Sequence, residues 1–295
     1  MLTRRVILAA AVGGALAGVT GCVRRDPTVS GRPTGTPSAD RSPSPVALAQ
    51  YAGLPAGLAA AVRAGAPGAD RLGGFRDRAA AAFDAQAAVL APGTTATAPA
   101  GSLADSAHSA GAQLLGASAR GTAAARLAAA GAYAAAIGSL ASTTAPRTPT
   151  EGPSSATVTA LGDAEAMTAL ITQLSAAVYA TEAALAHFSG EDTRWARATL
   201  DGHRATLDGL AAELTRRSVR VPAPAVAYDI GRPSDAASAA TLMARVQTAV
   251  LPDACRVVRA ATDDGVRTLG ASALQDAAVA VARSGGALPV WPGWA

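Results

Sequence analysis

The residues that could do chemistry in this chain are few, and three of them fall at similar depth in two neighbouring predicted helices. Tyr179 and Glu182 lie near the apolar stripe of one helix, and His203 lies on the apolar stripe of the next. Because a buried tyrosine or histidine usually finds a hydrogen-bond partner, we expect these three side chains to form a buried polar cluster. Such a cluster either fixes the register of two packed helices or lines a pocket for a ligand or a single metal ion.

A second group has the residue types of a hydrolase without the required spacing. Asp105 and His108 lie three residues apart, with Ser106 and Ser109 beside them. No glycine-flanked serine turn of the kind that presents a nucleophile accompanies them, and no glycine-rich loop suited to a phosphate is present in the chain. We therefore predict no catalytic residue.

The charge pattern argues against a nucleic-acid partner. All 25 basic residues are arginine, the formal net charge is +4, and the arginines are scattered among acidic and small residues. No basic stripe with interleaved aromatic side chains occurs, so we expect no binding to nucleic acid. Of the two cysteines, Cys255 has no partner once Cys22 is modified, and it is expected to be a small buried apolar side chain.

Residues 1–21 have the three parts of an export signal. Arg4 and Arg5 precede an apolar run that is shorter than the ~20 residues of a spanning helix, and small residues lead to Cys22. The stretch Val19-Thr20-Gly21-Cys22 resembles the lipobox of bacterial lipoproteins. That resemblance implies a diacylglycerol on Cys22 and a mature chain held at the outer face of the cell membrane. The paired arginines also resemble a twin-arginine signal, so both export routes stay open.

The remainder of the chain divides by composition. Residues 22–45 are rich in proline and serine, and they are expected to be a disordered tether. Residues 46–141 are rich in alanine with helical spacing, and this region should be mobile or should need a packing partner. A linker at 142–156 leads to the best-patterned region, 157–288, and a short tail follows at 289–295.

The best-patterned region predicts an all-α fold with four helices. Short links join the first two helices and the last two, so each pair should be antiparallel neighbours. The connection from Val219 to Ser234 contains three prolines and is long enough to cross the bundle. One long crossover is the ferritin-like arrangement, which we predict over residues 157–285. Pro252 should kink the third helix, and no alternating apolar run predicts a strand.

Short motifs occur in a characteristic order in this region. They are Ala176–Tyr179, the stretch from His203 to Leu210, Val221–Pro224 with Ala227-Tyr228 after it, and Leu288–Gly293. Together they resemble an uncharacterised ferritin-like domain family of lipoproteins from high-GC Gram-positive bacteria. The resemblance implies a fold and a location, but no known activity.

A ferritin-like fold raises the question of a di-iron centre, which requires two Glu-x-x-His pairs on facing helices. None of the three histidines has a glutamate three residues earlier, because those positions hold Asp105, Ala184 and Leu200. We therefore predict no cofactor and no bound metal.

Three functional hypotheses remain. The leading one is a non-enzymatic, lipid-anchored domain that interacts with a protein partner or acts as a scaffold. The second is a degenerate ferritin-like domain that binds a metal ion or small ligand near Tyr179, Glu182 and His203. The third is an enzyme whose site lies within residues 46–141.

Overall fold

The computed structural model describes residues 48–144, 146–153 and 157–294, and this part of the chain is mostly helical, which confirms the all-α prediction. The helices are α2 (Gly53–Ala64), the 3-10 helix η1 (Ala69–Phe75), α3 (Arg76–Leu90), α4 (Leu103–Leu115), α5 (Gly121–Ser142), α6 (Asp163–Leu185), α7 (Gly190–Arg216), α8 (Ala236–Ala260) and α9 (Asp264–Arg283). Cys22, the export signal at 1–21 and the tether at 22–45 lie outside the described residues.

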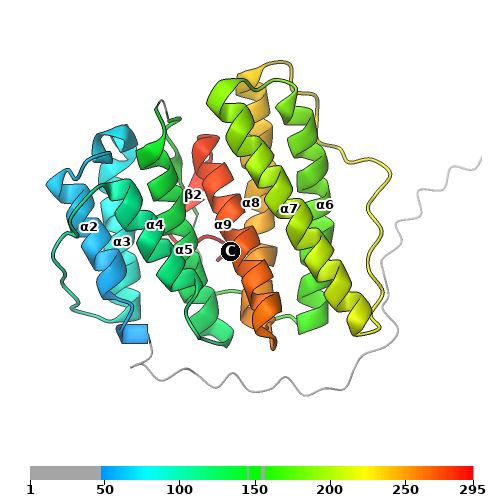
Figure 1. Cartoon of the computed structure of the whole chain (residues 1–295), viewed down its shortest axis with the longest axis horizontal. Helices are drawn as coiled ribbons and strands as arrows, with labels where there is room; N and C mark the ends of the chain where they lie inside the picture. The colour runs from blue at the N-terminus through cyan, green and yellow to red at the C-terminus, as the bar shows by residue number, and fades with distance from the viewer. Residues whose placement is uncertain (1–47, 145, 154–156, 295) are drawn as a thin grey trace, which may run out of the picture. The chain divides into compact units, whose positions relative to one another are not determined.

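Helices α6 to α9 pack as a four-helix bundle. Both α6 and α9 pack against α7 and α8, so α7 and α8 lie opposite each other across the bundle. Residues 217–235 join these two helices, and this connection runs back along the length of the bundle (Figure 1). Side chains define where the last two helices begin, because Asp235 and Ser238 form a capping box on α8 and Asp263 caps α9. The expected helices and long crossover are therefore present.

Pro252 lies inside α8, and the helix continues through it from Ala236 to Ala260. Leu251, Ala254 and Cys255 on either side of the proline are buried in the core, so packing holds this stretch of α8 in place.

Helix α5 connects the two halves of the chain through a shared core. It packs against α4 on one side and against α8 and α9 on the other, and one hydrophobic cluster extends from Leu58 to Trp294. Residues 46–141 therefore pack against the bundle within residues 157–288. This is one of the two alternatives expected for them, the other being a mobile region. Within the described residues, α5 is also the helix long and apolar enough to cross a membrane, but 94% of its apolar window is buried inside the protein.

Small residues let α4 and α5 approach closely. A Cβ atom at Gly131 would lie 2.9 Å from the carbonyl oxygen of Gly111 on the neighbouring helix. In this alanine-rich region, short distances between backbones compensate for the lack of large side chains, since dispersion contacts depend on close approach.

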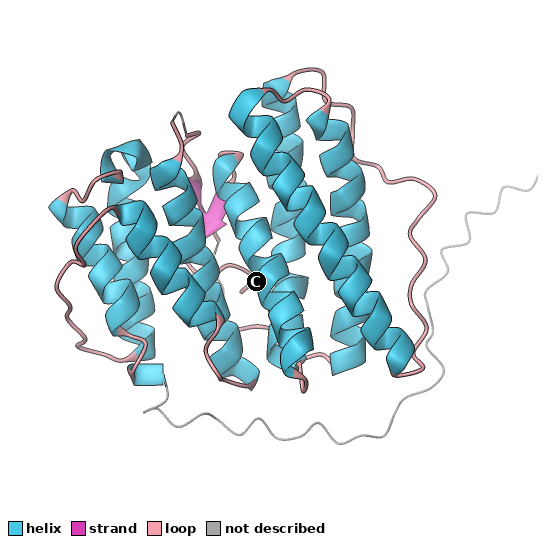
Figure 2. Ribbon diagram, in the orientation of Figure 1, coloured by secondary structure: helices cyan, strands magenta, loops and turns pink. Residues whose placement is uncertain are grey.

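A small parallel sheet corrects the expectation that the chain has no strand. Strand β1 (Thr150–Gly152) pairs with β2 (Ala287–Pro289), drawn in magenta in Figure 2. Part of the segment predicted as a linker therefore pairs with the last two residues of the predicted domain, Ala287 and Leu288, and with Pro289, the first residue of the tail. Strands of three residues are too short to produce a recognisable alternation of apolar and polar positions.

Candidate functional site

The three residues predicted to form a buried polar cluster do not meet. Tyr179 is 42% exposed, and its ring centroid lies 5.5 Å from that of Tyr228 in the long connection. The carboxylate of Glu182 is also exposed and forms an ion pair with Arg204 of α7. Only His203 is buried, so the predicted cluster of three is wrong.

The error lies in the rotation of α6 about its axis. The face of α6 that enters the core near the predicted cluster is formed by small residues, Ala177, Ala180, Thr181 and Ala184. A search based on large apolar side chains places the stripe on Val178 and Leu185 instead. The predicted stripe is thus offset from the buried face by about one residue, or roughly 100° of helix rotation. With that offset, Tyr179 and Glu182 are predicted at the edge of the core, whereas the structure has them on the surface.

His203 instead pairs with Gln247 of α8. Its Nε2 atom lies 2.8 Å from Oε1 of Gln247, and both side chains are fully buried. Because α7 and α8 are opposite helices, this hydrogen bond crosses the bundle. Sequence reasoning missed Gln247, since a single neutral amide on an amphipathic helix carries no motif.

The His203–Gln247 pair leaves two nitrogen atoms unsatisfied. Nδ1 of His203 and Nε2 of Gln247 are buried and have no hydrogen-bond partner within the described part of the chain. Burial lowers the pKa of His203, and the hydrogen bond with Gln247 only partly opposes this effect, so the ring is neutral near pH 7. The described residues contain no group of three or more His, Cys, Asp or Glu side chains arranged to hold a metal ion.

The hydrolase-like residues are not arranged for catalysis. Asp105 accepts a hydrogen bond from the Ser102 hydroxyl at 2.6 Å, and Ser102 in turn caps the start of α4. His108 is exposed on the next turn of the same helix and faces a cleft. The role of Asp105 is therefore to help begin α4.

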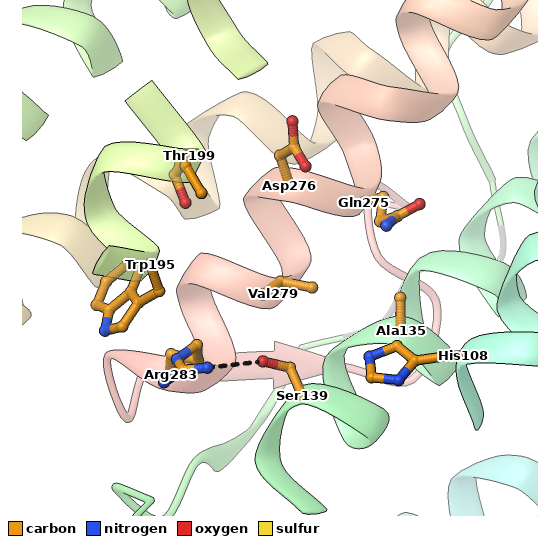
Figure 3. Close-up of a pocket in the computed structure, with 10 residues that line it drawn as sticks. His108, Ala135, Ser139, Trp195, Thr199, Gln275, Asp276, Val279 and Arg283 are labelled. Atoms are coloured by element: carbon orange, nitrogen blue, oxygen red, sulfur yellow. Dashed lines mark hydrogen bonds between the residues drawn. The ribbon is translucent and has the colours of Figure 1, made fainter. Parts of the chain in front are cut away.

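The cleft that His108 faces has a volume of about 280 Å³ and is formed by four helices. Helix α9 runs along its middle, with α7 on one side and α4 and α5 on the other (Figure 3). Its lining residues are His108, Ala135, Ser139, Trp195, Ala198, Thr199, Gln275, Asp276, Val279 and Arg283. Six of these ten residues are polar or charged, and Ala135, Trp195, Ala198 and Val279 form the apolar part of the lining, so the cleft is a small site of mixed polarity.

At one end of the cleft, the charge of Arg283 is already matched. Its side chain is only 11% exposed, and its guanidinium forms an ion pair with Glu191. It also donates a hydrogen bond to the Ser139 hydroxyl at 3.2 Å and lies over the ring of Trp195, 5.8 Å from the centroid. These contacts fix Arg283 in one position.

Trp195 is held in place by a second ion pair. Its indole nitrogen donates to Asp192 at 3.0 Å, and Asp192 pairs with Arg147 at 2.7 Å. Burial raises the pKa of Asp192, but the hydrogen bonds from Arg147 and Trp195 outweigh it and hold the pKa below its ordinary value. This end of the cleft is therefore a network of paired charges.

At the other end of the cleft, the carboxyl group of Asp276 has no hydrogen-bond or ion-pair partner among the described residues. Burial raises its pKa to about 6, and no neighbouring charge contributes to the shift. One of its oxygens lies against Gly202 of α7, in the space that a Cβ atom there would fill. Asp276 escaped sequence reasoning because it adjoins the alanine stripe of α9 without forming a motif. The available signal was a carboxyl group at the edge of an apolar face.

Comparison with known proteins covers part of the fold. Residues 166–295 match a family described as Domain of unknown function (DUF4439), which is less than half of the chain. The match takes in the α7 and α9 sides of the cleft, while α4 and α5 lie outside it. A crystal structure of a conserved hypothetical protein, rv2844, from Mycobacterium tuberculosis is similar at 25% identity and a TM-score of 0.39, over 41% of this chain and 93% of that chain. No curated protein matches.

Proposed function

We propose that this protein is a lipid-anchored, ferritin-like helical domain on the outer face of the cell membrane, which acts by binding rather than by catalysis. The cleft carries the binding role. It offers apolar walls, one matched arginine and one unpaired carboxyl group. Its hydroxyl groups, Ser139 and Thr199, are not hydrogen-bonded to a histidine or carboxylate among the described residues, so no activated nucleophile supports a hydrolytic role.

A cleft-blocking variant tests the binding role. Ala198 is an exposed residue that lines the cleft, and Ala198→Trp should fill it with an indole. Ala205→Trp places the same group on α7 at an exposed position that does not line the cleft. We expect ligand-observed NMR of the full chain in nonionic detergent to find fragments that bind the wild type and Ala205→Trp but not Ala198→Trp. A mixed-charge fragment library without any such member would contradict the binding role.

The sequence around Cys22 supports the lipid anchor. Two acyl chains on one cysteine give stable membrane attachment, whereas the polar tether that follows contributes little apolar area. Cys22→Ser should move the protein out of the detergent phase or leave an unprocessed precursor. Cys255→Ala, which removes a buried thiol, is the matched control. Unchanged partitioning of a Cys22→Ser chain that has lost residues 1–21 like the wild type would contradict the anchor.

The connectivity of α6 to α9 supports the ferritin-like proposal. Each of these helices has two neighbours within the bundle, and the single long connection joins the opposite helices α7 and α8. This is the arrangement in which one crossover runs along a four-helix bundle.

The unsatisfied nitrogens of His203 and Gln247 favour a second candidate, a degenerate ferritin-like domain that binds a metal ion or small ligand at the bundle centre. Elemental analysis of the full chain tests the metal version. About one equivalent of metal per chain, lost in His203→Ala, would support metal binding at the bundle centre. His187→Ala, which removes a histidine just after α6, is the control and should retain the metal. Two neutral side chains make a poor metal site, so we expect far less than one equivalent.

A further inference from the structure

We propose that the cleft between α4–α5 and α7–α9 binds a small organic cation, such as a primary ammonium or guanidinium group on a short apolar body, with Asp276 as its charged partner. This inference rests on the proposed binding role of the cleft and names the chemical class of its ligand.

The charges of the cleft select a cation. Arg283 is neutralised by Glu191, so it has little charge left for an anionic ligand. Asp276 is the unmatched charge, and the described residues offer it neither a hydrogen bond nor an ion pair. A partly buried carboxylate without a partner has lost part of its hydration, and a ligand that donates charge-assisted hydrogen bonds would compensate for that loss.

The shape of the cleft sets the size of the ligand. Asp276 and Arg283 lie seven residues apart on α9, which corresponds to about 10 Å along the helix. Between these two ends the walls include Val279 and the apolar side chains of Ala135 and Ala198. A ligand with its cationic group at Asp276 would therefore place an apolar body of a few carbon atoms or one ring along Val279.

Polar neighbours favour an organic cation over a metal ion. Thr199 and Gln275 line the cleft with Asp276 and could accept further hydrogen bonds from an ammonium or guanidinium group. A divalent metal ion would need several oxygen ligands, and the cleft supplies one carboxylate. The described residues contain no cluster of three or more metal-binding side chains here.

Three probes with the same ring separate charge from shape. Benzylamine carries an ammonium group, benzyl alcohol a hydroxyl group and benzoate a carboxylate. The full chain, purified in nonionic detergent, is titrated with each probe by calorimetry at pH 7.5, with detergent alone as the blank. We expect benzylamine to bind at least about tenfold more tightly than benzyl alcohol, because only its ammonium group donates charge-assisted hydrogen bonds to the carboxylate. Benzoate should not bind.

A matched pair of variants assigns the effect to one carboxyl group. Asp276→Asn keeps the shape and removes the charge, and it should weaken benzylamine binding at least about tenfold. Asp208→Asn removes an exposed carboxylate from α7 that does not line the cleft, and it should leave the affinity unchanged. Melting curves of both variants confirm that they are folded at the titration temperature.

Three results would overturn the inference: no saturable binding of benzylamine at millimolar concentration, equal affinity for benzylamine and benzyl alcohol, or equal affinity of wild type and Asp276→Asn. The proposed binding role is tested separately. If neutral or anionic fragments bind in the cleft of the wild type but not of Ala198→Trp, the binding role is supported and the inference of a cationic ligand is contradicted.

Discussion

A carboxyl oxygen of Asp276 on α9 occupies the space beside Gly202 of α7 in which any other residue would carry its Cβ atom. The two positions are 74 residues apart in the sequence, and neither belongs to a recognisable motif. The glycine therefore does not serve a turn, because it lies in the interior of α7. It leaves room for the carboxyl group that ends the cleft.

This relationship predicts an energetic coupling between the two positions. In an ordinary helix interior, Gly→Ala stabilises by about 0.5–1 kcal/mol. Gly202→Ala should lose that gain in the wild type, because the new methyl group displaces the Asp276 carboxyl group, and should recover it in an Asp276→Ala background. Denaturant unfolding of the four chains should give a coupling of at least about 0.5 kcal/mol. Additive effects of the two substitutions would show that the carboxyl group moves away at no cost.

The raised pKa of Asp276 predicts an unusual dependence of stability on pH. Its pKa is about 6 in the folded chain against an ordinary value of 3.8, so between pH 4 and 6 the folded state binds more protons than the unfolded state. The free energy of unfolding contributed by this group therefore falls as the pH rises through that window, by up to about 3 kcal/mol. About one pH unit above 6 the loss is complete.

Asp276→Asn isolates this effect. The variant should be more stable than the wild type at pH 7.5, and the difference in melting temperature should shrink towards pH 4. The other titratable residues that line the cleft are His108 on α4 and Arg283 on α9, and both are retained in the variant. Asp208→Asn serves as the surface control. If the melting temperatures of Asp276→Asn and wild type differ by the same amount at pH 7.5 and pH 4, the raised pKa of Asp276 is contradicted.

How much of this fold the sequence predicts depends on the size of the side chains. The four helices of the bundle and the long connection follow from breaks at residues such as Gly190 and Asp263 and from stripes of leucine. The rotation of α6 does not follow, because alanines form its buried face near Tyr179, and alanine gives little contrast in hydrophobicity. Less of the candidate site could be predicted. His203 was identified from its position on an apolar stripe. Gln247 and Asp276 were not, because their contacts with His203 and Gly202 arise only when the helices pack together.

The close contact between α4 and α5 predicts that Gly131 tolerates no side chain. A Cβ atom there would lie 2.8 Å from Cγ of Leu115 and 2.9 Å from the carbonyl oxygen of Gly111. Gly131→Ala should therefore lower the free energy of unfolding by about 1–3 kcal/mol, despite the better helix propensity of alanine. Gly53→Ala, at a position with nothing within 4 Å of the added atom, should be neutral or slightly stabilising. Equal melting temperatures for the two variants would mean that α4 and α5 can separate freely.

The hydrogen bond between His203 and Gln247 yields the prediction that separates the two candidate functions. His203→Ala should destabilise the full chain by about 1–3 kcal/mol, because it removes buried packing and leaves the Gln247 amide without its partner. In a Gln247→Leu background the same substitution should cost less, since no orphaned amide remains. Thermal and denaturant unfolding of the four chains would measure both costs. If instead His203→Ala melts with the wild type, the pair does not hold α7 to α8, and its two unsatisfied nitrogens become the first place to look for a ligand at the bundle centre.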